Sequence, residues 1–260
     1  MRQGEPQDDV VFIGDVHRQW HHVVRGLAAL SRKPRAAVLL GDMECDQPLD
    51  KVAAPLLDAG IEVHWIWGNH DYDGGSEMWA NLVDGDRNPR TRAGLLNARV
   101  ATIGGVRIAG LGGTFRRRVW EPPSEPRLRT RRDLAMDLAD LGPDWTETQR
   151  QAMAHALGAM AIWPEDIETL AGLRAEVLVT HEAPSSHPQG FKVIDELARR
   201  MGARLVIHGH HHVCYRARAQ DGLEVQGVGA GWAIGLDGRP WWGGEPDRWL
   251  GPPPAGWAHL

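Results

Sequence analysis

Aspartate, asparagine and histidine recur along this chain in short blocks whose side chains suit metal chemistry. Carboxylate, amide and imidazole ligands together favour zinc, iron or manganese over calcium or a thiolate-bound metal. Two such ions, about 3.5–4 Å apart, can clamp the attacking and leaving oxygens of a displacement at phosphorus. The candidate ligands exceed the needs of one ion and suffice for two if one carboxylate bridges them. They are Asp15, His17, Asp42, Asn69, His181, His210 and His212.

Each block follows a short apolar run that predicts a buried strand. These runs are residues 10–14, 36–40, 61–67, 176–180 and 204–207. Helical patterns at 19–30 and 49–59 separate the first three runs, and this order predicts an α/β fold with a parallel sheet and crossover helices. Sites in open α/β sheets lie outside the carboxyl ends of the strands. A lone Asp after a strand is usually a cap, but five such ends at one rim indicate a site.

The rest of the chain predicts further elements within a single domain spanning residues 1–260. Residues 99–102 and 106–110 flank Gly104-Gly105 and predict a hairpin,. Helices are expected at 130–141 and 147–161, within a helical segment at about 127–172, and at 191–201. A late strand is expected at 223–228. The Pro/Gly/Trp-rich tail, residues 240–260, predicts irregular surface structure. Its tryptophans are Trp241, Trp242, Trp249 and Trp257.

Composition excludes several classes of protein. The chain is 42% hydrophobic and 24% charged, as expected of a globular protein,. Its net charge of −5 argues against a protein that coats nucleic acid,. No apolar run approaches the length of a membrane helix, and the polar start lacks a secretory signal, so no membrane partner is expected. Cys45 and Cys214 predict two reduced, buried thiols and a cytoplasmic location,.

The blocks DxH, GD, GNHD, a strand-end His and GHxH, in this order between Val10 and Val213, resemble the calcineurin-like metallophosphoesterase superfamily. The resemblance implies a four-layer α/β/β/α sandwich with mixed sheets and two transition metal ions, Mn, Fe or Zn. The implied ligands are Asp15, His17 and His212 for the first ion, Asn69, His181 and His210 for the second, and Asp42 as the bridge. The resemblance also implies that His70 contacts the phosphoryl group or protonates the leaving oxygen, and that Asp71 orients the His70 imidazole.

The activity that this resemblance implies is hydrolysis of a phosphate ester by in-line attack of a metal-bound hydroxide. A phosphomonoesterase and a phosphodiesterase or nuclease acting on cyclic nucleotides or nucleic acid both stay open, so nucleic acid enters only as a substrate. A non-catalytic scaffold with this fold is the other alternative, and the intact GNHD block favours an enzyme. The second block, GDMECDQ, lacks the arginine of the protein Ser/Thr phosphatases.

Five further side chains are candidate substrate contacts. Arg116, Arg117 and Arg118 follow the hairpin, and guanidinium groups match phosphate geometry,. A solvated charged loop is the alternative for this segment. His187 lies six residues after His181 on the same predicted loop. His211 would point away from the ligands on either side of it in an extended segment, toward substrate or solvent.

Overall fold

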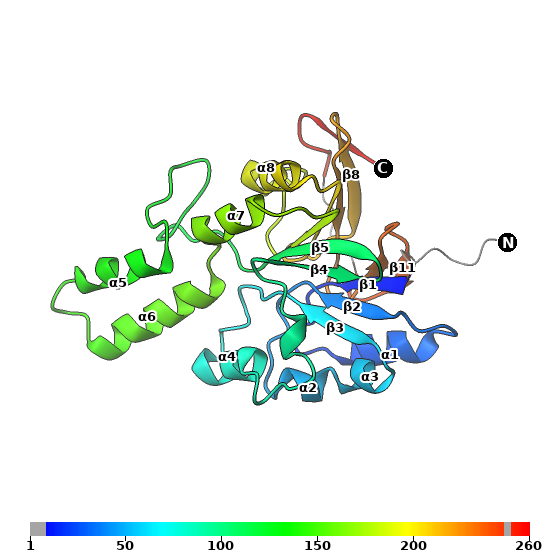
Figure 1. The fold of residues 1–260 in the computed structure, drawn as a ribbon, viewed down its shortest axis with the longest axis horizontal. Helices are drawn as coiled ribbons and strands as arrows, with labels where there is room; N and C mark the ends of the chain where they lie inside the picture. The colour runs from blue at the N-terminus through cyan, green and yellow to red at the C-terminus, as the bar shows by residue number, and fades with distance from the viewer. Residues whose placement is uncertain (1–8, 247–250) are drawn as a thin grey trace.

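The computed structural model describes residues 9–246 and 251–260. Residues 1–8 and Trp249 lie outside this range, so the expectations for the N-terminus and for that tryptophan are not addressed. The described strands form two mixed sheets (Figure 1). Within the described part of the chain, no helix combines the length and the apolar character that a membrane span requires.

The first sheet carries the N-terminal half of the candidate ligands. Its strands β1 (Val10–Ile13), β2 (Ala36–Leu39) and β3 (Glu62–Trp65) are parallel. Strands β10 (Ala233–Gly235) and β11 (Pro240–Trp242) add to the β1 edge in antiparallel register, giving the order β11-β10-β1-β2-β3.

The second sheet carries the C-terminal ligands. Its strands are β4 (Arg99–Ile103), β5 (Val106–Leu111), β6 (Val177–Thr180), β7 (Leu205–His208), β8 (Tyr215–Ala219), β9 (Glu224–Gly227) and β12 (Trp257–His259). The order is β12-β8-β9-β7-β6-β5-β4. Strands β5, β6, β7 and β9 are parallel, whereas β4, β8 and β12 pair antiparallel to their neighbours.

Helices cover the outer face of each sheet, so the molecule has four layers (Figure 1). Helices α1 (His21–Ala29), α2 (Leu49–Val52), α3 (Ala54–Asp58) and α4 (Gly75–Val83) lie on the side of the first sheet, with a 3₁₀ turn at Arg92–Gly94. Helices α7 (Pro164–Ala171) and α8 (Lys192–Met201) cover the second sheet. This is the predicted α/β/β/α sandwich.

Alternation along the buried strands explains the layering. Successive side chains of a strand point to opposite faces. Val10 and Phe12 therefore pack between the two sheets, against residues such as Ile108, whereas Val11 and Ile13 pack toward the helices of the first layer. All of these side chains are fully buried.

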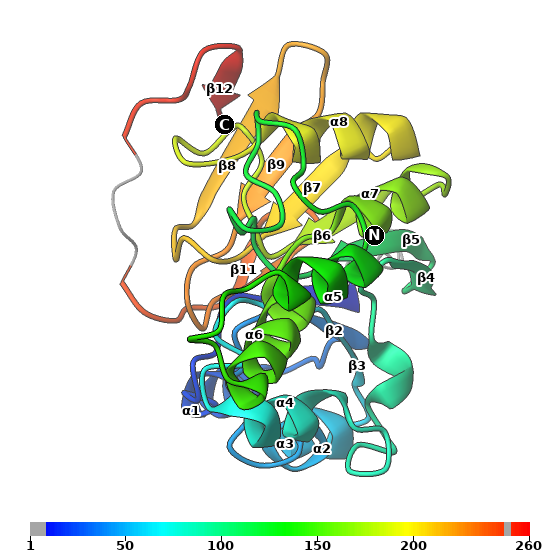
Figure 2. The ribbon, with the colours of Figure 1, turned by 90° about the vertical axis from the view of Figure 1, so that its left-hand side faces the viewer.

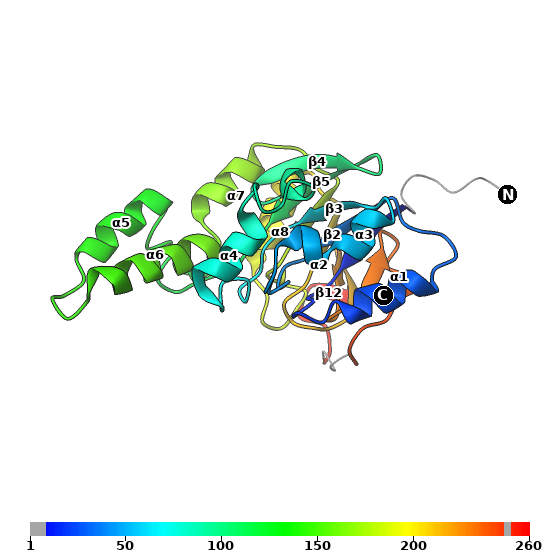
Figure 3. The ribbon, with the colours of Figure 1, turned by 90° about the horizontal axis from the view of Figure 1, so that it is seen from below.

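Helices α5 (Arg131–Ala139) and α6 (Glu147–Met160) form a hairpin that extends away from the sheets in Figure 3 and faces the viewer in Figure 2. Thr130 and Thr146 begin these helices with capping boxes, which satisfy backbone N–H groups of the first turn,. Leu134 and Leu138 of α5 belong to a small separate core that includes Trp163. The helical segment expected at 127–172 is therefore present as three helices.

Several predicted elements need correction. The helix expected at 49–59 is divided at Ala53 into α2 and α3, because Pro55 has no backbone N–H and sits in the first turn of α3,. Helix α4 and strands β8 and β10 were not predicted. Cys45 is buried as expected, but Cys214 is only half-buried, and its sulfur accepts a hydrogen bond from Gly229 N.

The expectation of an irregular surface tail holds for most of the described residues of the tail but is wrong for two short strands and for Trp242. Strand β11 extends the first sheet and β12 extends the second. Trp242 is 8% exposed and donates its indole N–H to Gly231 O at 3.2 Å. A Cβ at Gly26 of α1 would lie 2.3 Å from the Trp242 ring, so this glycine permits the close approach of α1 and the tail.

Candidate metal centre

The candidate ligands follow the ends of five parallel strands, and the structure brings them together from both sheets. Asp15 and His17 follow β1, Asp42 follows β2 and Asn69 follows β3. The second sheet supplies His181 after β6, and His210 and His212 after β7. The rim predicted from the sequence therefore exists, although it is shared between two sheets.

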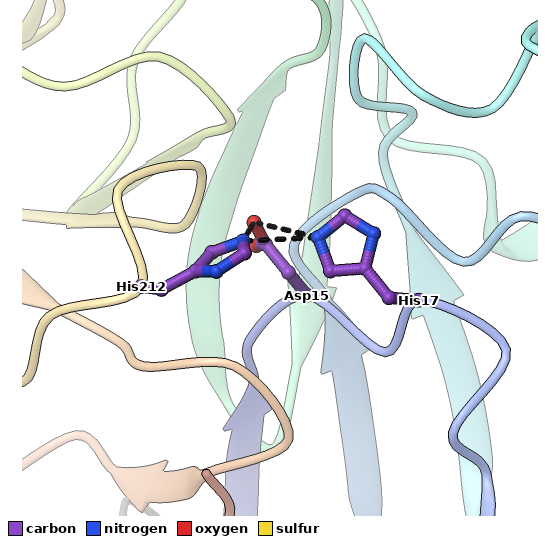
Figure 4. A group of neighbouring side chains, drawn as sticks. All are labelled: Asp15, His17 and His212. Carbon is purple, nitrogen blue, oxygen red and sulfur yellow. Dashed lines mark hydrogen bonds and ion pairs between the residues drawn. The ribbon is translucent and has the colours of Figure 1, made fainter. Parts of the chain in front are cut away.

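Asp15, His17 and His212 form the first group of ligand atoms (Figure 4). His212 Nε2 lies 3.0 Å from Asp15 Oδ2 and 2.9 Å from His17 Nε2. His17 Nε2 lies 3.9 Å from the same Asp15 oxygen. The three side chains converge on one point, in the combination predicted for the first ion.

Asp42, His181 and His210 form the second group. His181 Nε2 lies 3.2 Å from Asp42 Oδ2 and 3.1 Å from Asn69 Oδ1. Asp42 Oδ2 also lies 3.9 Å from His17 Nε2, so this oxygen faces both groups. That position is the one required of a bridging carboxylate.

The chemistry of this pocket fits a cation. Asp42 Oδ2 is buried and makes no hydrogen bond to any residue that the structure describes. An ionised oxygen in that state needs a compensating positive charge, which a protonated His181, 3.2 Å away, or a metal ion bound by that imidazole would supply,. Glycines keep the surrounding space open, because a Cβ at Gly68 would lie 2.1 Å from Asp42 Oδ1 and one at Gly209 would lie 2.2 Å from Asp15 Oδ1.

Four of the candidate ligands adopt a left-handed backbone conformation, which sets the direction of their side chains. The φ angles of His17, Asp42, His210 and His212 are 44°, 51°, 68° and 54°. Such a conformation costs a non-glycine residue about 1–3 kcal/mol and persists only where its surroundings enforce it. Here His17 N donates to Asp42 O at 2.8 Å, and His210 N donates to Asp15 Oδ2 at 3.0 Å. The ligand loops therefore hold one another in place.

The electrostatics of the site favour ionised carboxylates. Burial opposes ionisation of Asp15 and Asp42, but the imidazoles of His212 and His181 outweigh it and hold both pKa values below their usual range. Burial likewise opposes protonation of His181, but Asp42 raises the pKa of His181 to about 10. Burial, aided by the charge of His181, lowers the pKa of His210 to about 4, which leaves that imidazole neutral and able to bind metal,.

Comparison with known families agrees with this geometry. Residues 9–214 match the family model described as calcineurin-like phosphoesterase. The chain belongs to this family. A Haemophilus influenzae protein is 32% identical over 222 residues, which cover 85% of this chain and 90% of that protein. Membership makes the chain a metal-dependent phosphoester hydrolase, and the clustered Asp and His side chains supply its metal site.

Solved structures share the fold at low sequence identity. A protein of Thermus thermophilus superposes with a TM-score of 0.52 at 15% identity, over 89% of this chain and 96% of that one. A dimetal phosphatase from Danio rerio gives a TM-score of 0.52 at 13% identity, over 87% of this chain and 92% of that one. Both superpositions support the four-layer architecture.

The predicted pairing of Asp71 with the His70 ring is wrong. Asp71 is fully buried and accepts backbone hydrogen bonds from Asp42, Glu44 and Gly68, at 3.0, 2.7 and 2.8 Å. Asp71 thus ties the loop after β2 to the loop after β3. Asp73 takes the predicted place instead, with Oδ2 2.6 Å from His70 Nδ1. Its position three residues after His70 was the available signal.

The three candidate arginines, Arg116 to Arg118, have different surroundings in the structure. Arg118 pairs with Asp137 at 2.7 Å, and Arg117 is largely exposed, 3.8 Å from Glu121. Arg116 Nε is buried and has no hydrogen-bond partner in the described part of the chain. Unlike Arg117 and Arg118, Arg116 forms no ion pair with any residue that the structure describes.

His211 and His187 contact each other beside the second group. The segment around His211 is not extended, because both flanking histidines are left-handed, so the expected outward direction is wrong. The His211 ring stacks on His187 with 3.8 Å between centroids and 14° between planes. His211 Nε2 lies 3.6 Å from Oε1 of Glu182, a buried carboxylate that the sequence analysis did not single out.

Proposed function

We propose that this phosphoesterase hydrolyses a phosphate ester at a binuclear centre. One transition metal ion would lie in each ligand group, Asn69 would complete the second, and Asp42 would bridge the two ions. The observation that carries this proposal is the position of Asp42 Oδ2, buried without a hydrogen bond to any described residue, between His17 and His181. The shared fold of the dimetal phosphatase from Danio rerio supports it.

The bound ions would supply Lewis acidity and an activated water for in-line displacement at phosphorus. His70 holds the proton for the leaving oxygen. Its side chain is 45% exposed, and its ring centroid lies 5.5 Å from that of His17. Asp73 fixes the Nδ1 side of the ring, which leaves Nε2 to face substrate. Burial lowers the pKa of His70, but the Asp73 hydrogen bond outweighs it and raises that pKa above its usual value.

Arg116 is the residue we propose for phosphate recognition outside the metal ligands. Its Nε has no hydrogen-bond partner among the described residues. The preceding residue, Phe115, faces Glu182 Oε2 through its N–H at 3.4 Å, so the arginine loop adjoins the strand end that carries His181. His187 and His211, stacked beside the same strand end, would line the substrate side of the second ion.

A phosphodiesterase is the second candidate, and exposure of the site favours it. The side chains of His17, His210 and His212 are 22%, 26% and 22% exposed, so an ester with a large second substituent can reach them. Cyclic nucleotides or nucleic acid would then be substrates.

We propose that the reaction takes place in the cytoplasm, where a thiol such as buried Cys45 stays reduced,.

Asp42→Asn tests the proposal. Elemental analysis of the native enzyme is expected to find two transition ions per chain, and the variant is expected to lose occupancy at both positions together with activity. Asp46→Asn, an exposed change four residues later, is the matched control and keeps both. Two bound ions and full activity in Asp42→Asn would refute the bridge. Relative rates on p-nitrophenyl phosphate and bis-(p-nitrophenyl) phosphate separate monoesterase from diesterase.

A further inference from the structure

Glu44 is a carboxylate beside the first ligand group that neither the sequence motifs nor the proposed reaction uses. Its Oε1 lies 2.5 Å from His17 Nδ1. The other ring nitrogen of His17, Nε2, faces Asp15 and His212. The Glu44 side chain is 16% exposed, so water screens this contact only in part.

The surrounding loop holds the Glu44 carboxylate in a fixed orientation. Glu44 N donates to Asp71 Oδ1 at 2.7 Å, which anchors the backbone. Arg18 Nε lies 3.1 Å from Glu44 Oε2, so one carboxylate oxygen faces Arg18 and the other faces His17. Arg18 and Glu44 are both left-handed, with φ of 64° and 49°. Both conformations are costly for residues other than glycine and persist only where the surrounding structure enforces them.

We infer that Glu44 is a positioning residue that sets the affinity of the first metal site through His17. By accepting a hydrogen bond from Nδ1–H, Glu44 fixes the tautomer in which the Nε2 lone pair faces the ion, and its charge makes that nitrogen a stronger ligand. This inference rests on the proposed binuclear function. It adds a residue that discriminates between the two sites.

The second ligand group lacks an equivalent contact among the described residues. His181 Nδ1 faces the backbone oxygen of Leu40 at 2.8 Å. The His210 ring lies 4.0 Å from a carboxylate, measured from Nε2 to Glu182 Oε1. Both Glu182 oxygens already accept backbone hydrogen bonds, from Ala183 and Phe115. Removing the Glu44 charge is therefore expected to weaken the binding of one ion and to leave the binding of the other unchanged.

The test is a Zn²⁺ titration of the metal-free, full-length chain in competition with a chromogenic chelator. Wild type is expected to show two tight sites. Glu44→Gln keeps an oxygen that can face His17 but removes the charge, and Glu44→Ala removes both. We expect one of the two dissociation constants to rise about 10-fold in Glu44→Gln and about 100-fold in Glu44→Ala. Asp46→Asn, which removes the other partner of Arg18, is the control and leaves both constants unchanged.

The outcomes separate this inference from the proposed function. A wild-type chain that binds a single Zn²⁺ would refute the binuclear proposal, and Glu44→Gln would still report on that ion. Two unchanged constants in Glu44→Gln would overturn the role of Glu44. Equal weakening of both sites would also overturn it, because a general disturbance of the loop affects both groups. If Glu44→Ala does not fold, the isosteric Glu44→Gln carries the test alone.

Discussion

At the scale of single residues, the proton that the proposed reaction delivers to the leaving oxygen is assigned to His70, whose ring contacts Asp73. His70→Ala is expected to lower kcat by about 10²–10⁴-fold while metal content is retained, because His70 lies beside the ligands without being one. The loss is expected to be smallest for p-nitrophenolate, which needs little protonation, and largest for alkyl or ribose leaving groups. Steady-state rates on an ester series, together with elemental analysis, measure both effects.

Asp73→Asn and Asp71→Asn form a matched pair for this prediction. Asp73→Asn is expected to give a milder form of the His70→Ala pattern, because Asp73 only orients the ring. Asp71→Asn is expected to reduce metal binding and stability instead, because Asp71 accepts three backbone hydrogen bonds. An equal loss across all leaving groups in His70→Ala would show that His70 stabilises charge and donates no proton.

Residue types at the strand ends were enough to predict which side chains gather, and the family resemblance divided them into two ligand groups, but neither predicted which side chains support the ligands. Each ligand follows a strand, and strand ends meet at a rim. Asp73, Glu44 and Glu182 escaped the sequence analysis because ordinary acidic residues in loops carry no periodic signal. Their roles depend on left-handed turns, such as that at Glu44, which the sequence does not reveal.

At the scale of elements, the predictions succeeded where hydrophobic periodicity is long or continuous. The buried strands β1, β2 and β6 and the helix α8 follow from such patterns. Strand β10 has three residues, too few to show a period, and β12 depends on pairing with a strand far away in sequence. The two tail strands were not predicted for that reason, because the tryptophans and prolines do not indicate which sheet edges they join.

The helical hairpin is attached to the body through Arg131, and this attachment is testable. Arg131 contacts Asp166 Oδ2 and Glu165 Oε1 at 2.7 Å each, and its guanidinium lies 5.4 Å from the Trp163 ring centroid. Asp166 is nearly buried, but the Arg131 side chain is 37% exposed, so solvent screens part of the interaction,. Arg131→Ala is expected to lower the free energy of unfolding by about 1–2 kcal/mol.

Urea denaturation measures this loss. The control is Arg129→Ala, which removes a pair that is exposed on both sides, with Glu125 at 3.5 Å, and is expected to leave the midpoint unchanged. A midpoint for Arg131→Ala that matches the control would mean that the Arg131 contacts add nothing to the attachment of the hairpin.

At the scale of the whole molecule, the candidate metal centre lies where the two sheets meet. The first ligand group takes Asp15 and His17 from the first sheet and His212 from the second. The second group takes Asp42 from the first sheet and His181 and His210 from the second. Bound ions would therefore join the two sheets, in addition to the apolar layer packed between them.

Chelation is expected to destabilise the whole fold for this reason. A ligand that binds only the folded state adds about 2.7 kcal/mol at 100 times its Kd, so two ions at that excess add roughly 5 kcal/mol. For a domain of this size the thermal midpoint is expected to fall by about 10–20 °C when EDTA removes them. Differential scanning calorimetry with and without added Zn²⁺ measures the shift. Asp42→Asn is expected to show a much smaller response, because it lacks the shared ligand. An unchanged midpoint after verified metal removal would show that the sheets are held together without the ions, and would count against ligation from both sheets.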